Sequence, residues 1–152
     1  MKDRFELEIE GKLENLSRIG EFVGNSMSDF GLEDRKIFEV QLAVDEACSN
    51  IINYGYTETE DVGVITIICS TKENEVKIVI SDAGKPFDPT SVPPPDLDTN
   101  LEDRTVGGLG IHFIKTLVDE LRYEYRDGKN LLTLSISTSD RASKKHVSSR
   151  SH

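Results

Sequence analysis

Residues 107–114 have the sequence GGLGIHFI and decide the fold prediction, because three glycines run directly into an apolar helical pattern. Apolar side chains continue at helical spacing, at Ile111, Ile114, Leu117, Val118 and Leu121. Glycine has no Cβ, so a ligand can approach its backbone closely. The first amides of a helix have no intrahelical partner and lie at the positive end of the dipole. The pattern therefore favours a phosphate-binding turn, with a flexible connecting turn as the alternative.

Two common phosphate-binding motifs do not match this stretch. The P-loop motif requires a lysine after its last glycine, and none follows Gly110. The dinucleotide motif G-x-G-x-x-G has Phe113 in place of its third glycine. Any nucleotide must therefore bind in another way, and other parts of the chain must complete the site.

The chain has 152 residues, which suits a single domain with a real core. Its net charge of -10 argues against nucleic acid or a membrane surface as a partner, and any bound nucleotide would need a divalent cation. We expect no membrane span, because no apolar run reaches about 18 residues, and the N-terminus does not resemble a signal peptide. Cys48 and Cys69 lie in apolar contexts and are expected to be reduced core residues of a cytoplasmic protein.

The apolar periodicity predicts the order β-α-α-β-β-loop-α-β-β. The expected strands are 5–10, 62–70, 76–81, 121–126 and 131–136, and the expected helices are 13–27, 33–54 and the one that follows the glycines. Hairpins at 72–75 and Asp127-Gly128 join neighbouring strands. The order indicates an α+β two-layer sandwich, with a mostly antiparallel sheet and its helices on one face. The domain should span 1–137, with a disordered polar tail at 138–152.

Two further segments contain candidate site residues. On the second helix, Glu46, Asn50 and Asn53 follow i, i+4, i+7 spacing and should lie on a face away from the apolar stripe. Their oxygens would suit Mg²⁺ and its waters, although a solvated helix face is the alternative. At the end of the third expected strand, Asp82 followed by Gly84 could accept a hydrogen bond from an adenine amino group, or could form an Asx-turn. Residues 83–106 form a long loop with three consecutive prolines, which favours a lid.

Taken together, these segments resemble the three sequence boxes of the GHKL ATPase superfamily, whose domain has the Bergerat fold. The matching residues are Glu46, Asn50 and Asn53, then Asp82 and Gly84, and finally Gly107, Gly108 and Gly110. The stretch VDEACSNIINY, at residues 44–54, is similar to the first box of the anti-sigma-factor serine/threonine kinases. The resemblance covers about residues 3–137 and rests on the order and spacing of all three boxes.

The resemblance implies a role for each matched residue. Glu46 corresponds to the catalytic carboxylate that accepts a proton or positions the nucleophile, and Asn50 to the Mg²⁺ ligand. Asn53 would line the phosphate side of the site, while Asp82 and Gly84 would recognise adenine. The three glycines Gly107, Gly108 and Gly110 would contact phosphate, and Thr105 lies close enough in sequence to do the same.

The family resemblance implies an ATP- and Mg²⁺-dependent serine/threonine protein kinase. Such a kinase binds a sigma factor or similar regulator and phosphorylates a small antagonist protein, and the resemblance allows a homodimer. The alternative is a non-catalytic module in which ATP controls binding of a protein partner. A histidine kinase fragment fits less well, because the three histidines are His112, within the Gly-rich stretch, and His146 and His152 in the tail.

Overall fold

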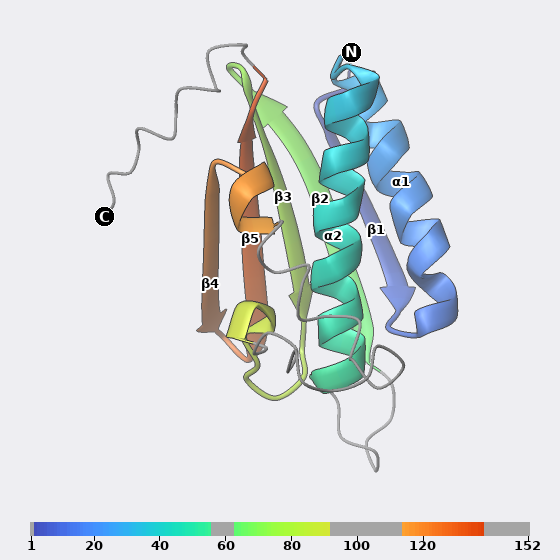
Figure 1. Cartoon of the computed structure of the whole chain (residues 1–152). Helices are drawn as coiled ribbons and strands as arrows, with labels where there is room; N and C mark the ends of the chain where they lie inside the picture. Colours follow the sequence, from blue (N-terminus) through green and yellow to red (C-terminus); the bar gives the residue numbers. More distant parts are fainter. Residues whose placement is uncertain (1, 56–62, 92–113, 139–152) are drawn as a thin grey trace, which may run out of the picture.

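The computed structural model describes residues 2–55, 63–91 and 114–138. The strands are β1 (Arg4–Glu10), β2 (Val64–Lys72), β3 (Glu75–Asp82), β4 (Glu120–Arg126) and β5 (Lys129–Ser137). The helices are α1 (Leu16–Asp29) and α2 (Asp34–Tyr54), with 3-10 turns η1 (Leu13–Asn15) and η2 (Pro89–Ser91) (Figure 1). Residues 114–117 form one further helical turn. Thr105, the glycines 107–110, residues 92–106 of the expected lid and residues 139–152 of the tail lie outside the described residues.

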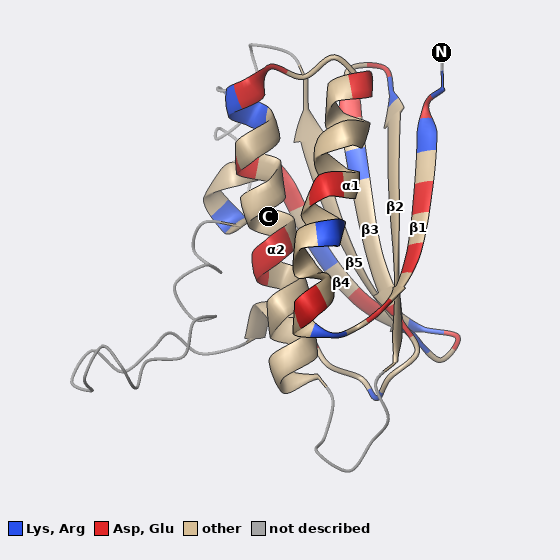
Figure 2. Cartoon of the chain, turned by 90° about the vertical axis from the view of Figure 1, so that its right-hand side faces the viewer, with Lys and Arg blue, Asp and Glu red and all other residues tan. Residues whose placement is uncertain are grey.

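The five strands form one sheet in the order β1-β2-β3-β5-β4, and every neighbouring pair is antiparallel. Helices α1 and α2 lie side by side on one face of this sheet, so that the described residues form two layers (Figures 1 and 2). This arrangement confirms the predicted α+β sandwich. No helix within the three described ranges is both long and apolar enough to cross a bilayer.

Two tight turns fix the pairing of the hairpins. Glu73 and Asn74 between β2 and β3 have positive φ angles of 52° and 66°. Asp127 and Gly128 between β4 and β5 have φ angles of 55° and 77°. Two successive residues with positive φ match the right-handed twist of the flanking strands, which is why Asn and Gly are favoured there. Both predicted hairpins are therefore confirmed, and each uses a two-residue turn.

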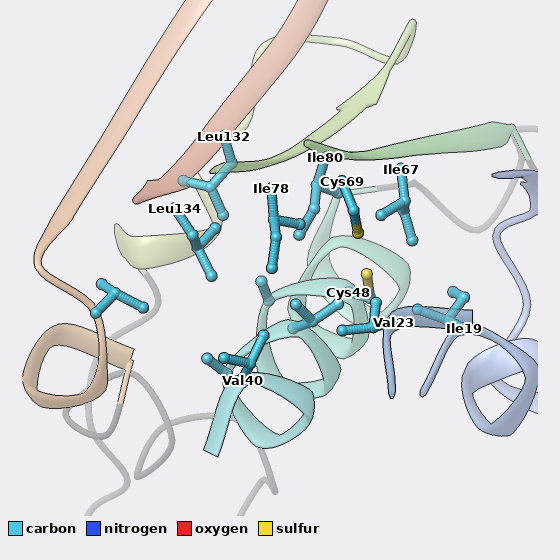
Figure 3. Close-up of a cluster of buried hydrophobic side chains, with 14 of the residues drawn as sticks. Ile19, Val23, Val40, Cys48, Ile67, Cys69, Ile78, Ile80, Leu132 and Leu134 are labelled. Atoms are coloured by element: carbon cyan, nitrogen blue, oxygen red, sulfur yellow. The ribbon is translucent and has the colours of Figure 1, made fainter. Parts of the chain in front are cut away.

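The core lies between the helices and the sheet, where alternate residues of the strands point toward α1 and α2 (Figure 3). It is rich in isoleucine and leucine from β2, β3 and β5, and the helices contribute Ile19, Val23 and Val40. Cys48 and Cys69 are both free and fully buried in this core, as expected from their apolar contexts. One boundary differs from the prediction, because the first helix begins at Leu16 after the η1 turn, and Leu13 is exposed.

The strand order also determines which polar residues meet. Because β5 lies between β3 and β4, the last residue of β3, Asp82, pairs directly with Asn130 near the start of β5. The chain then leaves β3 and reaches η2, where Pro89 contacts the C-terminal half of α2 through a hydrogen bond to Asn50. The segment 83–91 therefore connects the end of β3 with the helix that contains Glu46 and Asn50.

Candidate functional site

The three polar residues on α2 have different environments. Asn50 is completely buried, Glu46 is 9% exposed, and Asn53 is exposed near the end of the helix. The alternative of a solvated helix face is therefore wrong for Glu46 and Asn50, although their spacing still places them away from the apolar stripe. The physical reason is a second covering layer, since η2 packs on α2 and the Pro89 carbonyl accepts a hydrogen bond from Asn50 Nδ2 at 3.1 Å.

Two buried oxygens on α2 have no hydrogen-bond partner among the described residues. They are Glu46 Oε2 and Asn50 Oδ1, from residues one helical turn apart. Asn50 Nδ2 is engaged by Pro89, which fixes the amide and leaves its oxygen unpaired. Burying such an oxygen without a donor costs about 1–3 kcal/mol, so native proteins rarely keep one without a functional reason. A bound cation or a donor group would remove this cost.

The environment of Glu46 changes its proton affinity. Burial, followed by the neighbouring carboxylate of Asp45 as the smaller cause, raises the pKa of Glu46 from 4.5 to about 7. Burial also raises the pKa of Asp45, although its side chain is largely exposed. A carboxylate with a pKa near neutrality can accept a proton and release it again under physiological conditions, as a general base must.

The carboxylate of Asp82 forms the second part of the site. It is 7% exposed, and its Oδ1 accepts hydrogen bonds from the Gly84 N–H at 2.8 Å and from Asn130 Nδ2 at 3.0 Å. The bond from Gly84 is the Asx-turn that was considered as the alternative for this pair. It engages only one carboxylate oxygen, so the turn and recognition of a ligand by the other oxygen are compatible.

Asn130 is the polar residue of this region that sequence reasoning missed. It is 5% exposed and lies directly beside Asp82 in the sheet. The sequence contains one indication of its importance. Asn130 is a polar residue directly before Leu131 and Leu132, close to the predicted Asp127-Gly128 turn. The pairing with Asp82 becomes visible only when β5 is placed next to β3.

A magnesium ion fits the donor set that the structure shows. No group of three or more His, Cys, Asp or Glu side chains suited to a metal occurs in the described part of the chain. Mg²⁺ does not need such a cluster, because it keeps several waters and usually binds one or two protein oxygens together with substrate phosphates. The buried and unpaired Asn50 Oδ1 is a hard oxygen ligand of the required kind.

Comparison with known proteins identifies the class of this domain. A model of the histidine kinase-like ATPase domain matches residues 9–136, and the chain therefore belongs to this family. The matched range includes the end of β1, both helices, β2 to β4 and all but the last residue of β5, together with the segments that contain Asp82 and the glycines. The family recognised from the three sequence boxes is thus confirmed.

Individual relatives define the branch more closely. The serine-protein kinase RsbW from Staphylococcus aureus strains JH9 and Newman is 33% identical over 124 residues, covering 79% of this chain and 78% of the relative. Among solved structures, the RsbU and RsbW domains of a Mycobacterium tuberculosis protein match with a TM-score of 0.64 and 14% identity. That match covers 90% of this chain and 32% of the longer one, and it supports the fold alone.

Proposed function

We propose that this protein is an ATP- and Mg²⁺-dependent serine/threonine protein kinase of the anti-sigma-factor type. The observation that carries the proposal is the pair of buried, unpaired oxygens on Glu46 and Asn50, one turn apart on the same helix. The similarity to serine-protein kinases named RsbW supports serine as the phosphorylated residue type. Phosphoryl transfer depends mostly on positioning and charge neutralisation, which these two oxygens can provide.

Each residue has a distinct part in this proposal. Asn50 Oδ1 would hold a Mg²⁺ ion, which would neutralise phosphate charge when bound. Glu46 accepts the proton of the attacking hydroxyl, and its pKa of about 7 suits that step. The second oxygen of Asp82 accepts a hydrogen bond from the adenine amino group, while Gly84 fixes the first oxygen.

The remaining contacts are proposed from the sequence boxes. Asn53 is assigned to the phosphate side, where its exposure leaves it free to contact a nucleotide that lies across the end of α2. Gly107, Gly108 and Gly110 are assigned to the phosphates through their backbone amides, with Thr105 beside them. The protein partners that we propose are a small antagonist protein as phosphoacceptor and a sigma factor or similar regulator as the bound target.

A non-catalytic module controlled by ATP is the second candidate, and one hydrogen bond favours it. Asn50 Nδ2 holds the Pro89 carbonyl, so a cation or nucleotide at Asn50 would act directly on the chain segment that follows β3. That coupling could change a partner-binding surface without any transfer of phosphate. The two candidates therefore differ in the role of Glu46 rather than in the binding of ATP.

The deciding experiment measures binding and phosphate transfer separately in Glu46→Gln. Partners captured from the native host with ATP present supply the phosphoacceptor, and mapping of phosphorylated sites identifies the reaction. We expect Mg-ATP affinity within a few-fold of wild type and phosphate transfer slower by about 10²–10⁴-fold. Glu39→Gln is the matched control. It also removes a carboxylate from α2, but this carboxylate forms ion pairs with Arg35 and Lys36 at the surface. Unimpaired transfer in Glu46→Gln would assign the base elsewhere, and a wild-type protein that binds ATP and partner without transfer would favour the second candidate.

A further inference from the structure

The side chain of Asn130 uses its whole hydrogen-bonding capacity on the residues around Asp82. Its Nδ2 donates to Asp82 Oδ1 at 3.0 Å and to the Lys85 carbonyl at 2.9 Å, with a longer contact of 3.4 Å to the Gly84 carbonyl. Its Oδ1 accepts from the Phe87 N–H at 2.8 Å. One buried amide thus ties β5 both to the carboxylate at the end of β3 and to the backbone that follows it.

The orientation of this amide is determined by its partners. The Phe87 N–H can only donate, so it must face the oxygen of Asn130, and the carbonyl of Lys85 can only accept, so it must face the nitrogen. The Tyr123 hydroxyl on β4 also donates to Asn130 Oδ1. This hydroxyl is protonated near neutral pH, as an ordinary tyrosine is, and burial raises the pKa of Tyr123 further. A flipped amide would place like groups against each other on both sides.

These hydrogen bonds fix one oxygen of the Asp82 carboxylate. Its Oδ1 receives two N–H donors, from Asn130 and from Gly84, which hold the carboxylate plane in place. The other oxygen, Oδ2, accepts none of the hydrogen bonds seen within the described residues. A carboxylate held in this way presents a single acceptor in a set direction, which is the geometry needed to recognise one amino group.

We infer that Asn130 is a positioning residue that sets the base selectivity of the nucleotide site by orienting Asp82. This inference rests on the proposed function, because it assigns the ligand of Asp82 to the adenine amino group. Asn130 does not contact the base in this assignment. It acts through Asp82 Oδ1, so its contribution should be seen only with ligands that carry the amino group.

The test compares ATP with purine riboside triphosphate, which lacks only the 6-amino group, by calorimetry in the presence of Mg²⁺. Wild type should prefer ATP by at least about tenfold, as expected for a hydrogen bond to a charged acceptor. Asn130→Asp retains the oxygen that Phe87 and Tyr123 contact and replaces the donor that faces Asp82. Asn130→Ala removes the donor without adding charge. In both variants the preference for ATP should fall by about threefold to tenfold, mainly through weaker ATP binding.

Tyr123→Phe is the matched control, because it removes a different hydrogen bond of the same side chain and leaves the donor to Asp82 in place. It should keep the wild-type preference for ATP. If both Asn130 variants lose affinity equally for the two ligands, Asn130 has only a structural role and the inference is overturned. A wild-type protein that binds neither triphosphate would instead contradict the proposed function, so the two failures are distinguishable.

A second measurement uses the unaltered chain and does not depend on the stability of any variant. The side-chain amide protons of Asn130 can be followed by nuclear magnetic resonance during titration with each triphosphate. ATP should shift these protons more than purine riboside triphosphate does, because only ATP adds a hydrogen bond to the carboxylate that they contact. Equal shifts with both ligands would overturn the inference.

Discussion

Replacing Glu46 with glutamine should change how the stability of the protein depends on pH. The folded protein binds a proton at Glu46 more tightly than the unfolded chain does, because burial raises the pKa from 4.5 to about 7. The free energy of unfolding should therefore decrease as pH rises between these two values, and the loss should be complete above pH 7. Glu46→Gln has no proton to lose at this position, so its stability should lack this decrease.

The size of the effect follows from the two pKa values. One pKa unit corresponds to about 1.4 kcal/mol, so the rise from 4.5 to about 7 is equivalent to at most about 3 kcal/mol for the ionised form. The ionised form of Glu46 is unfavourable because its buried Oε2 has no hydrogen-bond donor among the described residues to stabilise the charge. A few kcal/mol is a large part of the stability of a typical domain, which makes the effect measurable.

The assay is urea denaturation of both proteins, followed by circular dichroism, across a pH series from about 4 to about 8. The stability of Glu46→Gln minus that of wild type should increase by up to about 3 kcal/mol over this range. The buried glutamine amide can add a constant offset, so the change with pH is the quantity to compare. Glu39→Gln, whose carboxylate contacts solvent and two surface cations, should not reproduce the increase. Parallel curves for wild type and Glu46→Gln would refute the assignment of a raised pKa to this residue.

Three further predictions concern the other buried groups. Asn50→Ala should weaken Mg²⁺-dependent ATP binding in calorimetry, because it removes the buried oxygen that we assign to Mg²⁺; unchanged binding would contradict this assignment. Asp82→Asn should reduce the preference for ATP over GTP by about tenfold, and equal ATP and GTP affinities in wild type would remove the adenine assignment. Cys48 and Cys69 should react with a thiol reagent only in denaturant, because both are buried and burial raises the pKa of Cys69 to about 12; rapid reaction of the folded protein would contradict this.

The parts of the fold that the sequence predicts well are those set by neighbouring residues. The alternation in β1 and the Asp127-Gly128 turn depend on contacts within a few positions, and both were predicted with nearly correct bounds. The start of α1 is less well defined, because Leu13 continues the helical spacing but forms part of a 3-10 turn. Apolar spacing alone does not determine where the first intrahelical hydrogen bond forms.

The site is less predictable, because burial depends on distant segments. The spacing of Glu46 and Asn50 fixes their angle around the helix axis, but not what covers that side of the helix. Asn50 is buried by a contact with Pro89, 39 positions later, and Asp82 is oriented by Asn130, 48 positions later. Neither partner carries a motif of its own, and only the placement of β5 beside β3 and of η2 against α2 brings them into contact.

The segment 83–91 connects the two halves of the candidate site. Near its start, the backbone at Lys85 and Phe87 is held by Asn130, and near its end Pro89 is held by Asn50. Both anchors are buried side-chain amides, each fixed by a backbone group of this segment. A shift of the segment would therefore disturb the carboxylate that we assign to adenine and the oxygen that we assign to Mg²⁺ at the same time. In the proposed site, this shared support links the residue that we assign to adenine with the residue that we assign to Mg²⁺ through one short segment of backbone.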